Sequence, residues 1–215
     1  MSMEDLTTAP PVKGRVTRRD WLRAARNTLV TEGVSQVKVL TLANQLEVAR
    51  SSFYWFFESR GDLLDALLSE WELRNTSSIV DKCALPTVSI AEAAWNFFEC
   101  FIDDTLFDQG LDFAVREWAR RDAAVRAKID LADAARLQAV EGLFLRHGYP
   151  PHVADARARI LYFMQLGYHA LEVREPMELR MSRLHEYLIG FTGETVDEET
   201  LAKFKARAFA LRSEG

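Results

Sequence analysis

The sequence predicts an all-α protein made of an N-terminal three-helix domain and a larger helical domain, with about nine to ten helices in all. Apolar residues recur at helical spacing along most of the 215-residue chain, and ten Gly and six Pro separate the periodic stretches. Alternating β-branched runs and Asn-Gly hairpin signals do not occur, so strands are not expected.

The N-terminal domain contains three predicted helices. Residues 1–12 are polar, end in two prolines and are expected to form a mobile arm. The first helix begins near Thr17, which has capping-box spacing to Asp20, and Gly33 ends it. Two short helices follow at 39–46 and 50–56. We therefore assign residues 13–60 to a DNA-binding domain of helix-turn-helix type.

The larger domain covers residues 61–215. Its first helix, about 61–80, is opened by Ser59 and connects the two domains, and residues 82–89 with Pro86 form a break. Further helices are expected at 89–107, 111–120, 122–147, 151–174, 177–191 and 197–212.

Composition and charge limit the function classes. With 48% hydrophobic and 27% charged residues, the composition is that of a globular protein, and the apolar run 160–171 is too short to span a bilayer, so a cytoplasmic protein is expected. Cys83 and Cys100 lack CxxC spacing and the four His are scattered, so we expect no metal and no cofactor. Residues 13–60 hold nine Lys or Arg against four Asp or Glu, within a chain of net charge −5, and such a basic end can meet phosphates.

The strongest motif is the pair of short helices. A helix-turn-helix needs apolar residues at fixed places and a small residue where its helices approach closely. Ala43 is the expected small residue, and the core-facing set is Leu42, Leu46, Val48, Phe53 and Phe56. This spacing leaves the opposite side of the second helix for the major groove: Ala49, Arg50, Ser51, Ser52 and Trp55.

The segment LTLANQLEVARSSFYWFFESRGDLLDAL, after a helix and Gly33, resembles the N-terminal signature of the tetracycline-repressor (TetR) family over about residues 15–68. The resemblance implies that Tyr54 donates its hydroxyl to a phosphate and that Arg60 holds another phosphate. Three positions depart from the family pattern: Glu47, Ala49 and Lys38. Glu47 replaces a frequent turn Gly, where a left-handed backbone costs about 1 kcal/mol, and Ala49 replaces a frequent capping Ser.

Arg50 is the candidate for base contacts, because its guanidinium can address guanine, although it can also bind phosphate. Trp55 either packs against the DNA or is half-buried, and Lys38, where a capping Thr is common, either reaches a phosphate or is solvated. The full DNA-binding set is Arg18, Lys38, Arg50, Ser51, Ser52, Tyr54, Trp55 and Arg60.

In the second domain, the resemblance implies an apolar effector pocket, whereas the residues alone show only aromatic helices. Gln165 and His169 lie one helical turn apart and either present a polar handle, satisfy each other or face a partner chain. The pocket candidates are Trp95, Phe98, Phe101, Trp118, Tyr162, Gln165 and His169.

Dimerisation is expected because residues 160–171 are apolar nearly all round, which requires cover on two sides. Gly167 permits close helix approach, and the resemblance implies that two late helices pair with their mates. The interface candidates are Ile160, Met164, Gly167, Leu171, Leu184 and Leu188.

These features predict a homodimeric repressor that a small, largely apolar effector releases from operator DNA, with coupling through the connecting helix. The alternative is a helix-turn-helix protein without a small-molecule effector, controlled by a protein partner. An enzyme is not expected, because no catalytic motif occurs and Asp103 and Asp104 diverge by about 100° on a helix.

Overall fold

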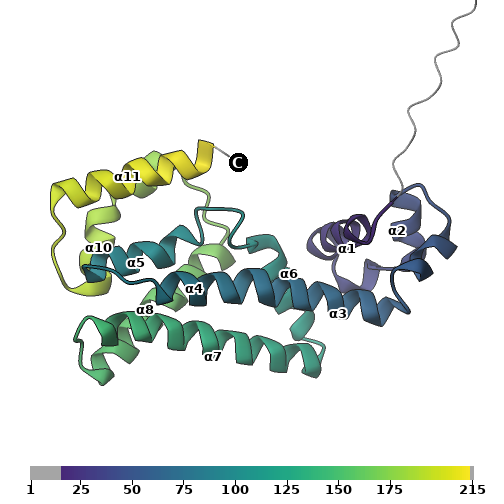
Figure 1. Cartoon of the computed structure of the whole chain (residues 1–215), viewed down its shortest axis with the longest axis horizontal. Helices are drawn as coiled ribbons and strands as arrows, with labels where there is room; N and C mark the ends of the chain where they lie inside the picture. The colour runs from purple at the N-terminus through teal and green to yellow at the C-terminus, as the bar shows by residue number, and fades with distance from the viewer. Residues whose placement is uncertain (1–15, 214–215) are drawn as a thin grey trace, which may run out of the picture.

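The computed structural model describes residues 16–213, and this part of the chain is all-helical, with eleven α-helices and no strand. The expected arm, Lys13 and Arg15 lie outside the described residues. A small N-terminal head and a larger helical body are joined by one long helix (Figure 1), which confirms the predicted fold class. The α-helices are α1 (Arg18–Glu32), α2 (Val39–Gln45), α3 (Arg60–Trp71), α4 (Ser78–Ala84), α5 (Ile90–Glu99), α6 (Gln109–Ala119), α7 (Ala123–Arg146), α8 (Pro151–Ala170), α9 (Met177–Ser182), α10 (Leu184–Thr192) and α11 (Glu198–Ser213).

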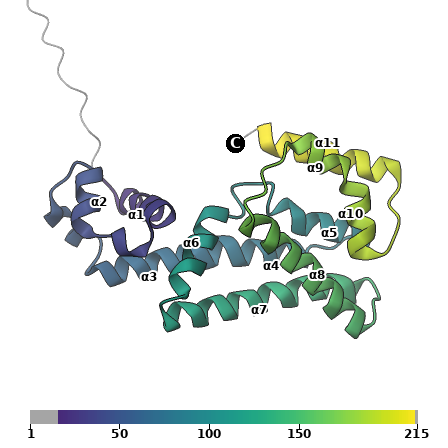
Figure 2. The same cartoon turned by 180° about the vertical axis from the view of Figure 1, so that it is seen from behind.

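Helix α1 forms the centre of the head. Thr17 and Asp20 make the predicted capping box, and Gly33 ends the helix with a φ of 83°. The buried face of α1 carries Trp21 and Leu29, which pack in one apolar cluster with α3 and α6. Because that cluster continues from α1 into α6, the head rests on the body as well as on the connecting helix (Figure 2).

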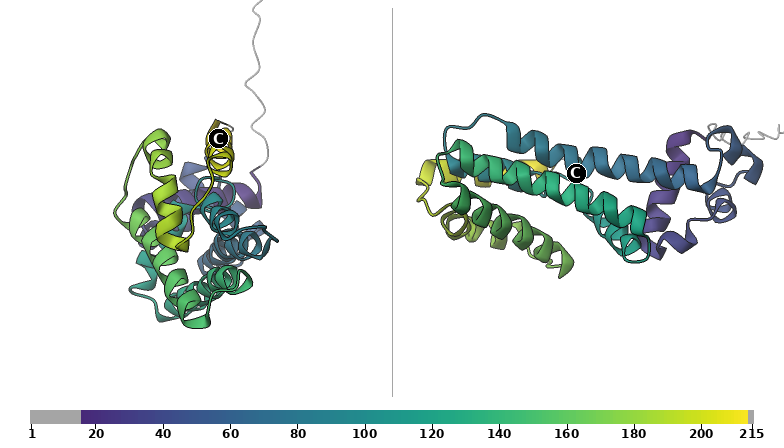
Figure 3. Two further views of the ribbon diagram at one scale, coloured as in Figure 1. Left: turned by 90° about the vertical axis from the view of Figure 1, so that its left-hand side faces the viewer. Right: turned by 90° about the horizontal axis from the view of Figure 1, so that it is seen from below.

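The connecting helix runs from Arg60 to Ala84 without a break, but its middle turn, Glu72–Ser77, is a π-helix. Asn75 and Thr76 in this turn are buried. A π-turn widens a helix by one residue and is frequent at functional sites. Here it turns two polar side chains towards the interior, alongside α6 and α7. The long helix and α7 lie side by side along the body (Figure 3).

Four helices differ from the predicted bounds. The connecting helix, predicted to end at about residue 80, continues to Ala84. The predicted helix 89–107 ends at Glu99, because Asp103 accepts hydrogen bonds from the Thr105 amide and hydroxyl and so competes with a helical backbone. The predicted helix 151–174 ends at Ala170, followed by Glu172 at a φ of 49°. The predicted helix 177–191 is two helices, α9 and α10, separated at Arg183.

Helix α11 lies across the body over α5 and α9 (Figure 1). Phe204 stacks on Trp95 with ring centroids 4.9 Å apart. Glu99, which is buried, accepts hydrogen bonds from Lys82 of α4 and Arg207 of α11 at 2.8 and 2.9 Å. The C-terminal helix is thus held by a stacked ring pair and by a shared buried carboxylate.

Candidate nucleic-acid interface

The turn between α2 and the next helix is tight and strained. Leu42 and Ala43 are buried, and the Val48 amide donates to the Ala43 carbonyl at 3.0 Å. Glu47 has a φ of 55°, the left-handed conformation that its replacement of Gly predicted. Such a backbone costs about 1 kcal/mol at a residue other than Gly. The head therefore retains the turn geometry at the expense of local strain.

The recognition helix, Arg50–Trp55, is a 3-10 helix and not the predicted α-helix. Ala49 occupies its N-cap position and supplies no side-chain hydrogen bond, as its replacement of Ser predicted. Phe53 and Phe57 anchor the helix: both are buried, their rings stack 5.4 Å apart, and Phe53 contacts Trp21 edge to face. The helix is positioned by aromatic packing beneath it, in place of a capping side chain.

The outer face of this helix carries the residues expected to meet DNA. Arg50 and Ser51 are exposed, Tyr54 is 51% exposed and Trp55 is 69% exposed. The Arg50 guanidinium donates to the Tyr54 hydroxyl across one turn at 3.4 Å. A cation, a phenol and an indole thus share one solvent-facing surface. Side chains of these types make base, phosphate and sugar contacts in DNA complexes.

The remaining candidates differ in how they are used. The Ser52 hydroxyl donates to the Ala49 carbonyl at 2.8 Å, so it makes the local bond that is common near a helix start. Lys38 is exposed at the uncapped start of α2. Arg18 is exposed and lies over the Phe57 ring, 4.9 Å from its centroid. Phe57 was not among the residues predicted to face the core, although its spacing of four residues from Phe53 indicates that both lie on the buried side of the helix.

Arg60 also has a structural role within the head. Its guanidinium donates to the backbone carbonyls of Val37 and Val34, both at 2.6 Å. These carbonyls belong to the segment that links α1 to α2, so Arg60 ties that segment to the start of α3. These two bonds use two of the five N–H donors of the guanidinium, and the exposed Arg60 side chain keeps the others for a phosphate, so that role stays a prediction.

The head is fastened to the body by a buried carboxylate. Asp108, the N-cap of α6, pairs with Arg26 of α1 and with Arg74 of the π-turn. The Asn75 side chain donates to the Asp108 carbonyl and accepts from its amide, both at 2.9 Å. Burial acts to raise the pKa of Asp108, but Arg26, the Leu111 amide and Arg74 together lower the pKa below its usual value.

A second buried carboxylate lies one turn further along α6. Asp112 accepts from the Trp71 indole at 2.8 Å and pairs with Arg116 and Arg136 at 2.8 and 3.0 Å. Burial acts to raise the pKa of Asp112, whereas the two guanidinium groups lower it further than burial raises it. Arg136 also donates to Tyr162 of α8 at 3.4 Å. Polar contacts therefore run from the head through α6 and α7 to α8.

Four of the seven pocket candidates lie together in the body. His169 accepts or donates one hydrogen bond with Gln165 at 2.7 Å, and its ring lies 5.2 Å from Phe101. Phe98 belongs to the same apolar cluster as Phe101. Burial lowers the pKa of His169 to about 4, so the ring is neutral at pH 7, and its Nδ1 atom has no hydrogen-bond partner among the described residues. Gln165 and His169 are hydrogen-bonded to each other, one of the options left open by their spacing, but this bond leaves His169 Nδ1 without a partner in the described part of the chain.

The other three pocket candidates lie elsewhere. Trp95 is buried under α11. Tyr162 is part of the polar network around Asp133, to which its hydroxyl donates at 2.7 Å. Trp118 is half-buried beside the head and donates to Asp122 at 3.2 Å. Periodicity placed these side chains inside the protein but could not say which helix covers each of them.

The dimer candidates fall into two groups. Ile160 is 56% exposed and Leu171 is 78% exposed, with half-buried Met164 and Gly167 between them on α8. Leu184 and Leu188 are buried at 4% and 0% exposure within their own chain. These two leucines pack in the cluster beneath α11 and α5, so their assignment to an interface is corrected.

Comparison with known proteins agrees with this geometry. Residues 22–67 match the model of the bacterial regulatory proteins, tetR family. The fold is similar to the crystal structure of Mycobacterium smegmatis AmtR, with 19% identity, a TM-score of 0.59, and coverage of 94% of this chain and 98% of that chain. It is also similar to a TetR-family transcriptional regulator from Marinobacter aquaeolei VT8, with 15% identity, a TM-score of 0.61, and coverage of 93% and 98%. No curated protein matches the sequence.

The fold and the exposed recognition surface define a helix-turn-helix protein with a separate helical body. The match of residues 22–67 to the model of the bacterial regulatory proteins, tetR family, agrees with the resemblance in this N-terminal part of the chain. Within residues 16–213, no group of three or more His, Cys, Asp or Glu is arranged to hold a metal ion. In the same part of the chain, no helix is both long and apolar enough to cross a membrane.

Proposed function

We propose that the protein is a sequence-specific DNA-binding transcriptional regulator. The observation that carries the proposal is the exposed face of Arg50, Tyr54 and Trp55, held on a helix that Phe53 and Phe57 anchor from beneath. Residues 13–60 form the DNA-binding domain and residues 61–215 the regulatory domain. No catalytic activity is included in the proposal.

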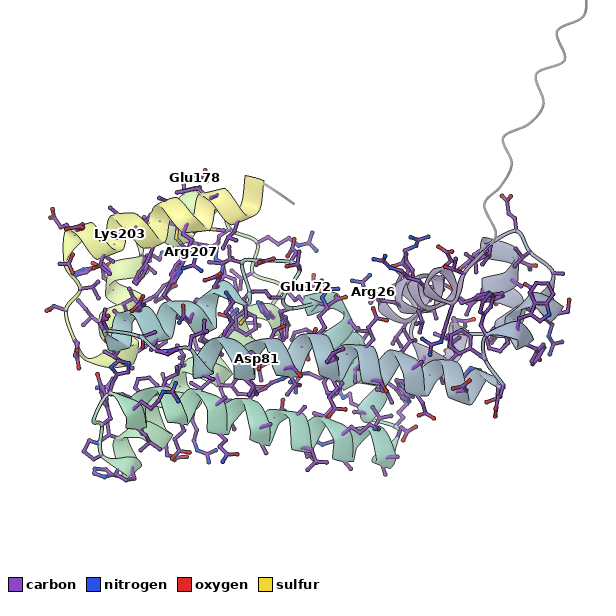
Figure 4. The ribbon with its side chains drawn as sticks, viewed as in Figure 1. Arg26, Asp81, Glu172, Glu178, Lys203 and Arg207 are labelled. Atoms are coloured by element: carbon purple, nitrogen blue, oxygen red, sulfur yellow. The ribbon has the colours of Figure 1, made fainter. Side chains whose placement is uncertain are left out.

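Footprinting on the intergenic DNA that flanks the gene tests DNA binding, and absence of protection at modest salt would contradict it. Arg50→Ala should then weaken specific binding by about 1–3 kcal/mol if the guanidinium contacts a base. Lys203→Ala is the matched control, because Lys203 lies on α11, far from the head (Figure 4). If the variant instead loses the same affinity for every DNA sequence, and the slope of log affinity against log salt concentration falls by about one, Arg50 contacts a phosphate.

The active form is proposed to be a homodimer that pairs through α8. Ile160 and Phe163 are 56% and 49% exposed on this helix, with Met164 and Gly167 beside them, and Leu171 at its C-cap is 78% exposed. A second subunit would remove these apolar surfaces from water and would place two recognition helices in successive major grooves.

Sedimentation equilibrium tests the dimer. Ile160→Glu should shift the protein to a monomer, because it would bury an unpaired charge in the interface. Val88→Glu is the control, since Val88 is 96% exposed before α5. An unchanged dimer in the Ile160 variant would contradict the α8 interface.

We further propose that the regulator is a repressor released by a small, largely apolar effector bound near Phe98, Phe101, Gln165 and His169. The unpartnered His169 Nδ1 and the surrounding aromatic rings support this proposal. A thermal-shift screen with the wild type and Phe101→Ala tests it. A compound that stabilises the wild type but not the variant supports effector binding. If no compound stabilises the wild type, the alternative of control by a protein partner is favoured.

A further inference from the structure

A groove of about 570 Å³ separates the head from the body. One wall is the end of α1 and the segment after it, including Leu29, Val30 and Gly33. The other wall is α6 with Phe113 and Trp118. This volume is within the range of small-molecule sites in proteins. No residue of the aromatic cluster at Phe101 and His169 lines this groove.

The floor of the groove is apolar and its geometry is fixed. Gly110 lies so close to α1 that a Cβ atom there would be 3.2 Å from Val30. The Trp118 indole donates to Asp122 at 3.2 Å, which holds the ring in place, and Phe113 and Ala114 are half-buried beside it. An aromatic ligand would therefore meet rings that are already ordered.

The rim of the groove is acidic. Glu32, Glu117 and Glu172 line it together with one cation, Arg121. The carboxylates of Glu117 and Glu172 have only exposed ion pairs, with Arg120 at 3.3 Å and Arg174 at 3.4 Å. Such exposed pairs contribute little and do not neutralise a rim effectively. The excess of carboxylates over an aromatic floor suits a cation that carries a flat apolar group.

A strained residue lies at the same place. Glu47 and Glu172 are the non-glycine residues with positive φ in the described part of the chain. Glu47 shapes the DNA-binding turn, and Glu172, at 49°, carries one of the groove carboxylates. Its amide donates to the His169 carbonyl at 2.8 Å, so the strained turn is also joined to the helix of the aromatic cluster. Retained strain of this kind is concentrated at ligand sites and switches.

We propose that this groove is a second small-molecule site, which binds a cationic aromatic compound between the head and the body. The Trp118 ring supports the apolar group, and Glu117 and Glu172 face the cation. Because one wall belongs to the head and the other to the body, the ligand favours one placement of the head. It therefore changes operator affinity, a consequence that rests on the proposed function.

The test uses the full chain and three probes of one size: 1-naphthylmethylammonium, 1-naphthylmethanol and 1-naphthylacetate. Calorimetry should show the cation binding about threefold or more tighter than the neutral probe, with the anion weakest. In nitrogen-15 spectra the indole signal of Trp118, assigned by its loss in Trp118→Phe, should shift on binding. Equal affinity for the three probes, or an unmoved Trp118 signal, would overturn the proposal.

Charge variants locate the site. Glu117→Gln and Glu172→Gln should each lower the affinity for the cation about threefold and leave the affinity for the neutral probe unchanged. Glu172→Gly should give the same loss while keeping the left-handed backbone, so a folding defect cannot explain it. Glu178→Gln is the matched control on α9 (Figure 4). If neither rim variant changes the affinity for the cation but Phe101→Ala lowers it, the probe binds in the body and the proposed groove site is refuted.

The regulatory consequence has a separate readout. Operator DNA should change the affinity for the cation by the same factor by which the cation changes operator affinity. If the rim variants weaken binding of the cation but operator DNA does not change its affinity, the proposed coupling is refuted and the proposed site is supported. Failure of the protein to bind any DNA would contradict the proposed function without affecting the probe measurements.

Discussion

Removal of the Asp112 charge is expected to be among the most destabilising isosteric changes in the body. Asp112 and Arg136 are both 0% exposed, and their side chains lie 3.0 Å apart. In Asp112→Asn, the Arg136 guanidinium keeps its hydrogen bond to the Tyr162 hydroxyl at 3.4 Å and a longer ion pair with Asp133 at 3.8 Å. Breaking a buried pair by removing one partner costs about 3–5 kcal/mol. That loss is a large part of the roughly 5–15 kcal/mol that stabilises a typical domain.

The opposite variant should cost less. In Arg136→Met the Asp112 carboxylate keeps Arg116 at 2.8 Å and the Trp71 indole at 2.8 Å, so no charge is left without a partner. We expect a loss of about 1.5–3 kcal/mol, the range for a hydrogen bond to a charged group. The double variant lacks the stranded guanidinium, so its loss should fall short of the sum by about 1–3 kcal/mol.

Urea unfolding at fixed protein concentration, followed by circular dichroism and by tryptophan fluorescence, measures the three losses. Trp71 reports on the network directly, because its indole donates to Asp112. Losses that add within about 0.5 kcal/mol, or an Asp112→Asn loss below about 1 kcal/mol, would refute the account of Asp112 as the charge that neutralises Arg136.

Four further predictions concern pH, the head and the C-terminal helix. The folded pKa of Asp112 is lowered from 3.8, so its charge stabilises the fold above that pH, and the contribution is lost as pH falls through the folded pKa. Between about pH 5 and pH 3 the urea midpoint should therefore fall further in the wild type than in Asp112→Asn. Glu47→Gly should be more stable than Glu47→Ala by about 1 kcal/mol in thermal unfolding, and equal stability would argue against strain at this φ of 55°. Ala49→Ser should add about 0.5–2 kcal/mol by capping the recognition helix, measured in the same way against Ala49→Gly. Phe204→Ala should increase hydrogen exchange in α11 more than in α7, since Phe204 stacks on Trp95; uniform exchange would contradict local docking.

The sequence predicted the fold class because local signals were strong. Capping residues and Gly33 set the ends of α1, and the spacing of Leu42, Ala43 and Phe53 predicted a buried helix-turn-helix core. The left-handed turn at Glu47 was also predictable, since the motif dictates the backbone whatever residue occupies it. These features depend on residues close together in the chain.

Features that depend on distant residues were not predictable. The carbonyls that Arg60 contacts are 23 and 26 residues away, so its use inside the head has no local signature. Leu184 and Leu188 have the spacing of an interface helix, and only the position of α11 shows that their own chain covers them. The buried pairing of Asp112 with Arg136 joins two helices whose charged residues resemble solvated ones in the sequence.

The π-turn at Glu72–Ser77 has a consequence for the comparison of this protein with its relatives. One additional residue in a continuous helix advances every later side chain by about 100° around the axis. The match to the family ends at residue 67, before this turn. A relative whose connecting helix is α-helical throughout should therefore align with this chain only if a one-residue gap is opened within the helix. Without that gap, the residue equivalent to Ile79, which is buried here, would be assigned to the wrong side of the helix.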